Sequence, residues 1–375
     1  MPMPSRLNLY LDAECFIRPF GGIAKATWAL YEAFCRKYDD EFNVVAIRRN
    51  QTLQNPLPEG MHDLPLGDFP IRGPWRSLVL PPLSWMPHVD ALHFPNNGRI
   101  PFGVSKGLSS HKAFMTLHDV LPLEVDGYLE GGRRERYLKS TQADIDACAF
   151  VMTVSEYAKA QILRHFTPRN DIVVVPNAST LPKTHGRVPL ALSETQPYFL
   201  YTGRYEARKG IDTAIEAMVA LHERNALSSQ LWLTGRIKYF SKDFEALVKQ
   251  ATDLGIVKEL GYVSDEALAT LMHESRGLLY LSRSEGFGLP PLEAMTQGCP
   301  VITTALTAIP EVCGQAVLYV DPDDLEQVQQ AILQLEENAP LRMELIQKGL
   351  KQVQQFSWDA SADRLALALR EHFVH

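Results

Sequence analysis

The chain of 375 residues is poor in cysteine and has no long apolar run. Its five cysteines are an odd number and contain no Cys-x-x-Cys pair, so neither a disulfide framework nor a zinc site is expected. Reduced, mostly buried thiols are the simpler interpretation. No apolar run approaches the ~20 residues that span a bilayer. Asp12 and Glu14 interrupt the apolar stretch at 7–11, which argues against a secretory signal. We therefore expect a cytoplasmic protein, with peripheral contact to the inner face of a membrane left open.

The chain also lacks an excess of basic over acidic residues. The formal net charge of −7 argues against broad binding to nucleic acid. The acidic excess lies in the second half, because residues 1–186 are nearly neutral. The first half is thus the better candidate to meet an anionic or membrane-borne partner. A full Gly-x-Gly-x-x-Gly dinucleotide pattern does not occur either, which removes the main support for a hydride-transfer enzyme.

What the chain does contain is an alternation of short apolar runs with amphipathic segments. This α/β pattern predicts parallel sheets with helices on both faces, and 375 residues suit two such Rossmann-like domains. The strands expected from apolar runs are 7–11, 44–47, 91–94, 114–117, 150–154 and 172–175 in the first half, then 198–202, 231–234, 257–260, 278–281, 301–303 and 317–320.

Proline, glycine and polar residues break this rhythm between about 178 and 197, which predicts a linker. We expect one domain over 1–186 and a second over 187–356. The tail 357–375 reads as a helix, with Ser357 as a plausible N-cap and Trp358, Ala362, Leu365 and Leu369 on one face. It either finishes the second domain or crosses back to the first.

Three segments place chemistry-bearing side chains at expected strand ends. Arg204 and Lys209 lie five residues apart in a turn flanked by Gly203 and Gly210, where both could reach the oxygens of a diphosphate. His118 and Asp119 follow the strand at 114–117. Glu285 and Glu293, separated by seven residues, surround Phe287-Gly288-Leu289 and the start of a helix, where glycines and free amides favour a close anion.

These motifs resemble the retaining glycosyltransferases of family 4, which share the glycosyltransferase-B fold of two Rossmann-like domains facing across a cleft. The run from Glu285 to Glu293 resembles the family's Glu-x7-Glu signature. The run from Gly203 to Gly210 resembles its Gly-Arg-x-x-x-x-Lys-Gly segment. In this family the last helix usually packs on the first domain, so we favour the crossing. The resemblance covers nearly the whole chain. It implies that 1–186 is the N-terminal acceptor-side domain and 187–356 the nucleotide-sugar-binding domain.

The resemblance implies roles for the donor site. Arg204 and Lys209 would hold the diphosphate, and Glu285 would contact hydroxyls of the transferred sugar. The backbone amides of Phe287, Gly288 and Leu289 would face the sugar or the diphosphate. Glu293 would accept hydrogen bonds from the ribose, although a Glu in a first helical turn also complements the helix dipole.

Three further groups have implied roles and simpler alternatives. Gly21 and Gly22 would lie against the diphosphate and sugar, or be a plain helix cap. His118 would contact sugar hydroxyls, with Asp119 beside the donor or orienting His118. Tyr262 and Val263 would edge the nucleobase, while Ser264 or Asp265 caps the next helix. Arg208 reads as a surface charge.

Other charged runs have ordinary interpretations. Asp144 and Asp146 have the Asp-x-Asp form of metal-dependent transferases but fall in a helical stretch, and residues 321–324 suit a turn and helix cap. We expect no cofactor and no essential metal. The basic stretch 131–139, with Arg133, Arg134 and Arg136, reads as a solvated helix face, or as a contact for a phosphorylated lipid carrier or membrane surface.

The expected activity is transfer of a hexose from a nucleotide-diphosphate sugar to a hydroxyl of a glycan or lipid-linked acceptor. The resemblance to bacterial polysaccharide transferases makes mannose from GDP-mannose the first expectation. Two alternatives are a nucleotide-sugar epimerase or phosphorylase on the same fold, and a catalytically silent nucleotide-sugar-binding scaffold. The intact set of Arg204, Lys209, Glu285 and Glu293 argues against the scaffold.

Overall fold

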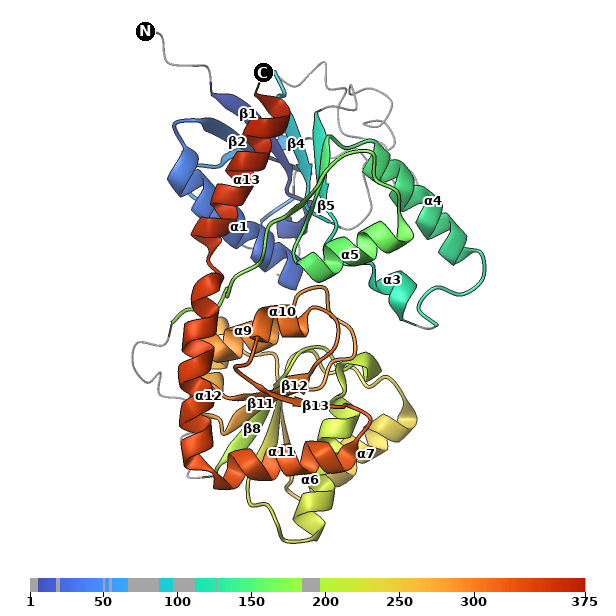
Figure 1. Cartoon of the computed structure of the whole chain (residues 1–375), viewed down its shortest axis with the longest axis vertical. Coiled ribbons are helices and arrows are strands. Elements are labelled where there is room, and N and C mark those ends of the chain that lie inside the picture. Colours follow the sequence, from blue (N-terminus) through green and yellow to red (C-terminus); the bar gives the residue numbers. More distant parts are fainter. Residues whose placement is uncertain are drawn as a thin grey trace. The chain divides into compact units, whose positions relative to one another are not determined.

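The computed structural model describes residues 6–17, 21–49, 51–53, 56–66, 88–96, 112–125, 127–183 and 196–374. The chain forms two compact units, the first made of residues 1–178 and 356–375 and the second of residues 179–355. The domain boundary expected between 186 and 187 lies outside the described residues. No helix in the described ranges combines the length and the apolarity needed to cross a membrane. Figure 1 shows both units and labels many of their elements.

The first unit is built on a parallel sheet with the order β3-β2-β1-β4-β5-β6-β7. Its strands are β1 (Leu7–Asp12), β2 (Phe42–Arg49), β3 (His62–Leu66), β4 (Ala91–Phe94), β5 (Ala113–Thr116), β6 (Phe150–Thr153) and β7 (Ile172–Val174). Its helices are α1 (Gly22–Tyr38), α3 (Leu121–Glu124), α4 (Arg133–Asp146), α5 (Glu156–His165) and α13 (Trp358–Phe373), with a 3-10 turn η1 (Glu14–Ile17).

The strand β3 was not expected from the sequence. It lies at the edge of the sheet, where Pro65 is tolerated because an edge strand needs only one ladder of hydrogen bonds. An ion pair between Arg48 of β2 and Asp63 of β3, with 2.6 Å between Nη2 and Oδ2, joins the two strands. The sequence of β3 therefore has a charged residue where a strand is usually recognised by alternating apolar residues.

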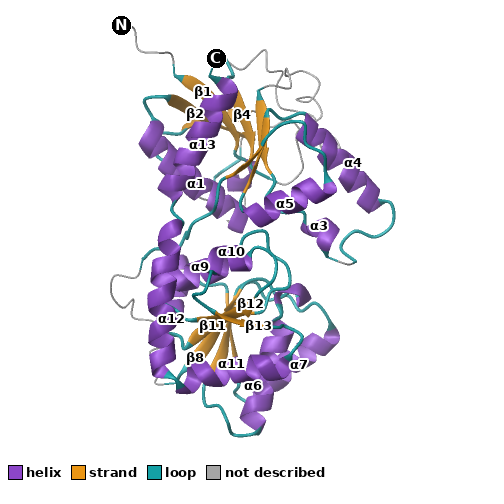
Figure 2. Ribbon diagram, viewed as in Figure 1, coloured by secondary structure: helices purple, strands orange, loops and turns teal. Residues whose placement is uncertain are grey.

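Both faces of the first sheet are covered by apolar side chains, as alternation along parallel strands requires. Leu9 and Leu11 of β1 face α1 and α13, whereas Tyr10 belongs to the layer that contains Ile145 of α4 and Ile162 of α5. Figure 2 shows the strands enclosed by these helices. The strand ends are therefore the parts of this sheet left for binding.

The tail helix α13 packs on the first unit, as the resemblance predicted. Leu365 and Leu369 are fully buried in the same core as Leu9, and α13 lies against α1. The N-cap prediction is confirmed, since the Ser357 hydroxyl accepts a hydrogen bond from the Ala360 amide at 3.1 Å. Arg370 of α13 pairs with Glu41 at 2.7 Å, which adds a polar rim to this contact.

The second unit has a parallel sheet with the order β10-β9-β8-β11-β12-β13. Its strands are β8 (Tyr198–Thr202), β9 (Gln230–Thr234), β10 (Val257–Gly261), β11 (Gly277–Tyr280), β12 (Val301–Thr304) and β13 (Leu318–Val320). Its helices are α6 (Ile211–Glu223), α7 (Lys242–Asp253), α8 (Asp265–Glu274), α9 (Leu289–Thr296), α10 (Ile309–Cys313), α11 (Leu325–Glu337) and α12 (Ala339–Gln352), with 3-10 turns η4 (Ala207–Lys209) and η5 (Val353–Gln355).

Each sheet has a point where the strand order reverses. In the first unit it lies between β1 and β4, and in the second it lies between β8 and β11. The loops that leave neighbouring strands at such a point run to opposite faces of the sheet and leave a crevice at the carboxyl edge. The loops after β8 and β11 carry the Arg204–Lys209 and Glu285–Glu293 motifs, so the topology brings the two motifs to one place.

Candidate active site

Gly210 sets the close approach of the two loops in the second unit. Its φ of +63° is in the left-handed region, and a Cβ there would lie 2.3 Å from the carbonyl oxygen of Leu281. Only glycine fits both constraints without strain. The turn η4 is therefore pressed against the end of β11, and this puts Lys209 beside Glu285.

Lys209 and Glu285 form the centre of a charge cluster that also includes Arg208, Tyr280 and Ser282. The Lys209 Nζ lies 2.5 Å from Glu285 Oε1, and the two side chains are only 12% and 13% exposed. Glu285 Oε1 also accepts hydrogen bonds from the hydroxyls of Tyr280 at 2.7 Å and Ser282 at 2.6 Å. A carboxylate held by several charge-assisted donors has a fixed orientation.

Burial and charge act in opposite directions on the two central groups. Burial raises the pKa of Glu285, but the nearby Lys209 and Arg208 cations more than offset this and hold the pKa below its usual value. Burial lowers the pKa of Lys209, and the Glu285 carboxylate opposes that effect. Glu285 is thus ionised at neutral pH and stabilises the protonated form of its partner.

The interpretation of Arg208 as a surface charge was wrong. Its side chain is 16% exposed, its Nη1 donates to the Ser284 carbonyl at 2.8 Å, and its Nη2 pairs with Glu206 at 2.9 Å. Arg204 is the exposed member, at 67%, and pairs with the same Glu206 at 2.7 Å. The sequence did not indicate which of Arg204, Arg208 and Lys209 points inward, because the 3-10 turn η4 sets the direction of the last two.

Tyr280 and Ser282 were also missed as site residues. Tyr280 is fully buried, and its hydroxyl accepts from Lys209 Nζ at 2.7 Å while donating to Glu285. Lys209 Nζ lies 5.1 Å from the centre of the Tyr280 ring. The only signal in the sequence was position, since Tyr280 is the last residue of β11 and Ser282 follows it by two residues.

The loops after β8 and β9 also meet closely. Gly235 has φ +120°, and a Cβ there would lie 2.1 Å from the Gly203 carbonyl oxygen. Farther out, Tyr262 follows the edge strand β10 and is 76% exposed, with Val263 half-buried beside it. Ser264 caps α8 by accepting from the Ala267 amide at 3.2 Å, which confirms the capping alternative without affecting the proposed role of Tyr262.

The segment after Glu285 begins α9. Gly288 is its N-cap, with φ +108°, Leu289 is its first residue, and Phe287 is buried. Glu293 is half-buried, and its Oε1 accepts a hydrogen bond from the Thr180 hydroxyl at 3.0 Å. This contact holds the segment after β7 against α9. Glu293 is therefore more than a surface charge at a helix start, while its role toward a ribose stays a prediction.

The Gly21-Gly22 pair starts α1 of the first unit. Gly21 is the N-cap, with φ −87°, and a Cβ on it would meet nothing within 4 Å. Its conformation is open to other residues, so the fold does not require a glycine there. Gly21, Gly22 and Ile23 are all exposed, which leaves the start of this helix accessible.

His118 and Asp119 follow β5 at the carboxyl edge of the first sheet. His118 Nε2 donates to the Pro95 carbonyl at 3.0 Å, and burial lowers the pKa of His118 to about 4, so the ring is neutral at pH 7. Asp119 Oδ1 accepts from the Leu121 amide at 3.2 Å and so supports the start of α3. A neutral His118 can donate or accept one hydrogen bond without carrying charge.

The two acidic strings lie on a helix and at a helix cap, as expected, although Asp144 and Asp146 are half-buried rather than fully solvated. Asp144 and Asp146 lie on α4, and Asp324 caps α11 by accepting from the Gln327 amide at 3.0 Å. Within the described ranges, no group of three or more His, Cys, Asp or Glu side chains is arranged to hold a metal ion.

Comparison with known proteins decides the family. The family model for Glycosyl transferases group 1 matches residues 183–352. The chain is 33% identical over 256 residues to the O-antigen chain mannosyltransferase B of Escherichia coli, an alignment that covers 66% of this chain and 67% of that protein. The chain belongs to the group 1 glycosyltransferases.

Two more similarities define this glycosyltransferase further. It is 27% identical over 227 residues to the O-antigen chain mannosyltransferase RfbU of Salmonella typhimurium, covering 60% of each chain, so the match spans less than two thirds of that relative. Its fold matches a sucrose-phosphate synthase of Thermosynechococcus elongatus with a TM-score of 0.76 at 20% identity, covering 98% of this chain and 99% of the other. The glycosyltransferase-B fold expected from the motifs is confirmed, and the epimerase, phosphorylase and scaffold alternatives are not favoured.

Proposed function

We propose that this glycosyltransferase retains the anomeric configuration of its donor and transfers mannose from GDP-mannose. The acceptor would be a hydroxyl of a glycan or lipid-linked saccharide. Two of its relatives carry the name O-antigen chain mannosyltransferase, which supports the sugar and the type of acceptor. The observation that carries the proposal is the buried Lys209 at the reversal point of the second sheet, next to the start of α6.

The leaving group needs positive charge as the sugar departs. In the proposed reaction the bond from the sugar C1 to the diphosphate oxygen breaks, and a bond from C1 to the acceptor oxygen forms on the same face. The acceptor proton passes to a diphosphate oxygen. Lys209, assisted by Arg208 and by Arg204 if it turns from Glu206, stabilises the charge that grows on the diphosphate. These cations make an essential metal unnecessary in the proposal.

Glu285 is proposed to position the sugar rather than to attack it. Its Oε1 already accepts from Lys209, Tyr280 and Ser282, and its lowered pKa describes a well-stabilised carboxylate. Stabilising a carboxylate in this way weakens it as a nucleophile. A glycosyl adduct trapped on Glu285 would overturn this part of the proposal.

The donor and the metal requirement can be tested together. Without acceptor and with EDTA present, slow hydrolysis is measured across GDP-, UDP-, dTDP- and ADP-sugars. We expect release of GDP from GDP-mannose, and its loss in Lys209→Ala. Release of a different nucleotide would replace the proposed donor. A strict need for added divalent metal would contradict the metal-independent mechanism, and the anomer of the transferred sugar, read by NMR, tests retention.

For the membrane contact, we propose that a cytoplasmic enzyme meets an anionic lipid surface through α4. Arg133, Arg134 and Arg136 lie in its exposed first turns, and Arg134 Nη1 donates to the Leu123 carbonyl at 3.1 Å. Reversing the charge of Arg133 and Arg136 should lower cosedimentation with vesicles containing anionic lipid. Lys159 on α5 is a control. Unchanged cosedimentation of the double variant would dispose of this contact.

A further inference from the structure

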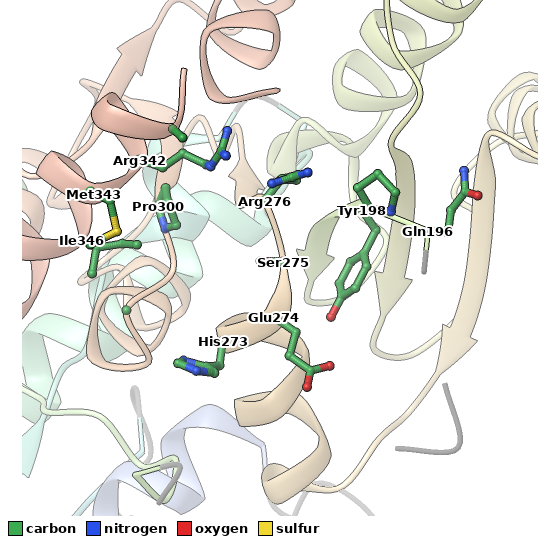
Figure 3. Close-up of a pocket in the computed structure, with 13 residues that line it drawn as sticks. Gln196, Tyr198, His273, Glu274, Ser275, Arg276, Pro300, Arg342, Met343 and Ile346 are labelled. Atoms are coloured by element: carbon green, nitrogen blue, oxygen red, sulfur yellow. The ribbon is translucent and has the colours of Figure 1, made fainter. Parts of the chain in front are cut away.

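A second binding site is suggested by a cavity at the amino edge of the second sheet. The cavity measures about 440 Å³ and is lined by the starts of β8, β11 and β12, the end of α8 and one face of α12 (Figure 3). Lys209 and Glu285 lie beyond the carboxyl ends of β8 and β11. The cavity is therefore separated from the charge cluster by the full length of the strands, and the transfer reaction does not use it.

Arg276 lines this cavity and has a side-chain nitrogen without a hydrogen-bond acceptor in the described part of the chain. It directly precedes β11, and its backbone amide donates to the Tyr198 carbonyl at 2.8 Å, so its main chain is fixed by the sheet. Its side-chain Nε is buried and has no hydrogen-bond partner among the described residues. Buried guanidinium donors nearly always have an acceptor, and an unmade bond at such a group suggests a partner that is not part of the fold.

Arg342 of α12 brings a second cation to the same cavity. Its Nη1 donates to the Glu336 carbonyl at 3.0 Å and also to the Leu335 carbonyl, both in the last turn of α11. These bonds hold its guanidinium in place. Burial first, and then the nearby charge of Arg276, lower the pKa of Arg342. Figure 3 shows the two guanidinium groups on the same side of the cavity.

No carboxylate of the described chain lies within ion-pair distance of either arginine. Glu274 lines the cavity but points away from them in Figure 3. The Glu336 carboxylate accepts from the Ser229 hydroxyl at 2.5 Å and the Ser228 hydroxyl at 3.2 Å. Glu336 attracts Arg342 electrostatically without forming an ion pair, and its carboxylate is already held by the two serines. An external anion would therefore relieve the repulsion between Arg276 and Arg342.

The remaining walls combine polar and apolar side chains, and the apolar ones lie beside the arginines. Tyr198, Pro300, Met343 and Ile346 surround the space beside the arginines (Figure 3). Small-molecule sites commonly combine an apolar wall with a few charged groups that fix orientation. We propose that this cavity binds a small organic oxyanion, a phosphate or carboxylate held by Arg276 and Arg342, whose organic part lies against the apolar wall.

The test measures anion binding in a Lys209→Ala background of the full chain, because a phosphate could also bind at the charge cluster. The probes are inorganic phosphate, glycerol phosphate and citrate, each compared with sodium chloride at matched ionic strength. Thermal melting and titration calorimetry follow binding. We expect at least one probe to raise the melting temperature. The response of phosphates against citrate distinguishes a phosphate ligand from a carboxylate ligand.

The decisive variant is Arg276→Met, which keeps the apolar stem and removes the guanidinium. It should weaken binding about tenfold or more, as loss of a charge-assisted pair predicts. Lys348→Met is the matched control, since Lys348 lies on α12 outside the cavity and pairs with Glu344. Equal binding by Arg276→Met and the control would overturn the proposal.

A second measurement checks the fold. Because Arg276 has an unmade bond and a like-charged neighbour, Arg276→Met should melt no lower than its parent in buffer without multivalent anions. A clearly lower melting temperature there would mean that Arg276 already has a partner within the protein, and the proposal would be wrong. No response of the parent protein to any probe would overturn it as well.

Discussion

Lys209 Nζ lies 2.5 Å from Glu285 Oε1 where the strand order of the second sheet reverses. The two residues come from loops 76 positions apart, and both side chains are nearly buried. A diphosphate that enters this place must compete with Glu285 for the cation. In the proposed mechanism the pair would keep Lys209 oriented before the donor arrives, so that little reorganisation is needed as charge develops.

Replacing Lys209 tests the proposed stabilisation of the leaving group. Lys209→Ala should lower kcat about 10²- to 10³-fold, because the interaction strengthens as the diphosphate departs. KM for the donor should change much less. The measurement is steady-state kinetics with the donor found by the hydrolysis panel. Full turnover by this variant would remove Lys209 from the proposed mechanism.

Replacing Arg204 and replacing Arg208 should have different effects on the free energy of unfolding. Arg208→Ala breaks a mostly buried network with Glu206 and the Ser284 carbonyl and should cost about 1–3 kcal/mol of unfolding free energy. Arg204→Ala, at an exposed pair, should cost less than about 0.5 kcal/mol. Urea unfolding compares them.

The kinetics of the same two variants then test the roles. If Arg204 turns from Glu206 to the diphosphate, Arg204→Ala lowers kcat with stability unchanged. A normal kcat for Arg204→Ala would assign the second cation to Arg208 alone.

Tyr280 is expected to be a positioning residue. Tyr280→Phe removes the hydroxyl that joins Lys209 to Glu285 but keeps the ring beneath the ammonium. We expect kcat to fall about tenfold, the equivalent of one hydrogen bond to a charged group, with donor KM little changed. Tyr198→Phe is a matched control, because its hydroxyl donates to the Leu271 carbonyl away from the cluster. Equal kcat for both variants would contradict this role.

Alanine substitutions at Gly210 and Gly21 should have different effects on stability. Gly210→Ala places a Cβ on the Leu281 carbonyl at a left-handed φ and should cost about 1–3 kcal/mol of stability. Gly21→Ala has room and an ordinary φ, so its melting temperature should stay within a degree or so of the parent. If Gly21 lies against the donor, Gly21→Ala loses activity although it is stable. An active Gly21→Ala would make the pair a plain helix cap.

Two histidines with lowered pKa values should make the first unit sensitive to acid. Burial lowers the pKa of His118 to about 4 and that of His93, between Tyr31 and Thr116, to about 3. Unfolding restores ordinary values near 6.5, so the unfolded chain binds more protons between these limits. Stability is full above pH 6.5 and falls as the pH drops toward 4.

The size of this effect can be measured by urea unfolding against pH. Each histidine contributes a slope of about 1.4 kcal/mol per pH unit below pH 6. His93→Gln should remove one of the two slopes, whatever it does to stability at pH 7. Activity between pH 6 and 9 should show no ionisation of His118. An inflection near pH 6.5 that His118→Gln abolishes would contradict the neutral ring and its lowered pKa.

Much of the fold followed from the sequence for a physical reason. Strands such as β8 and β11 are apolar on both faces, so their residues stand out as continuous runs, and both were placed to within one residue. The edge strand β3 was missed, since Pro65 and the charged Asp63 suit an edge and hide the apolar pattern. Continuous apolar runs identify strands that are buried on both faces, and an edge strand is buried less.

The site was predictable only as far as local motifs extend. Lys209 and Glu285 stood in recognisable glycine-flanked turns. Arg208 lies in the same turn as Lys209, but its inward direction was not predictable, because it depends on contact with Ser284 from another loop. The Arg276 cavity gave no signal at all, since it is assembled from segments far apart in the sequence, before β8, before β11 and along α12.

The helix α13 has a consequence for how the protein is made. The second unit is one continuous stretch, whereas the first unit waits for Leu365 and Leu369 to complete its core. At about 5–20 residues per second, on the order of 10–40 s separate synthesis of Ala178 from that of α13. During translation the unit begun first is thus finished last, and the surface of α1 that α13 later covers stays exposed until then.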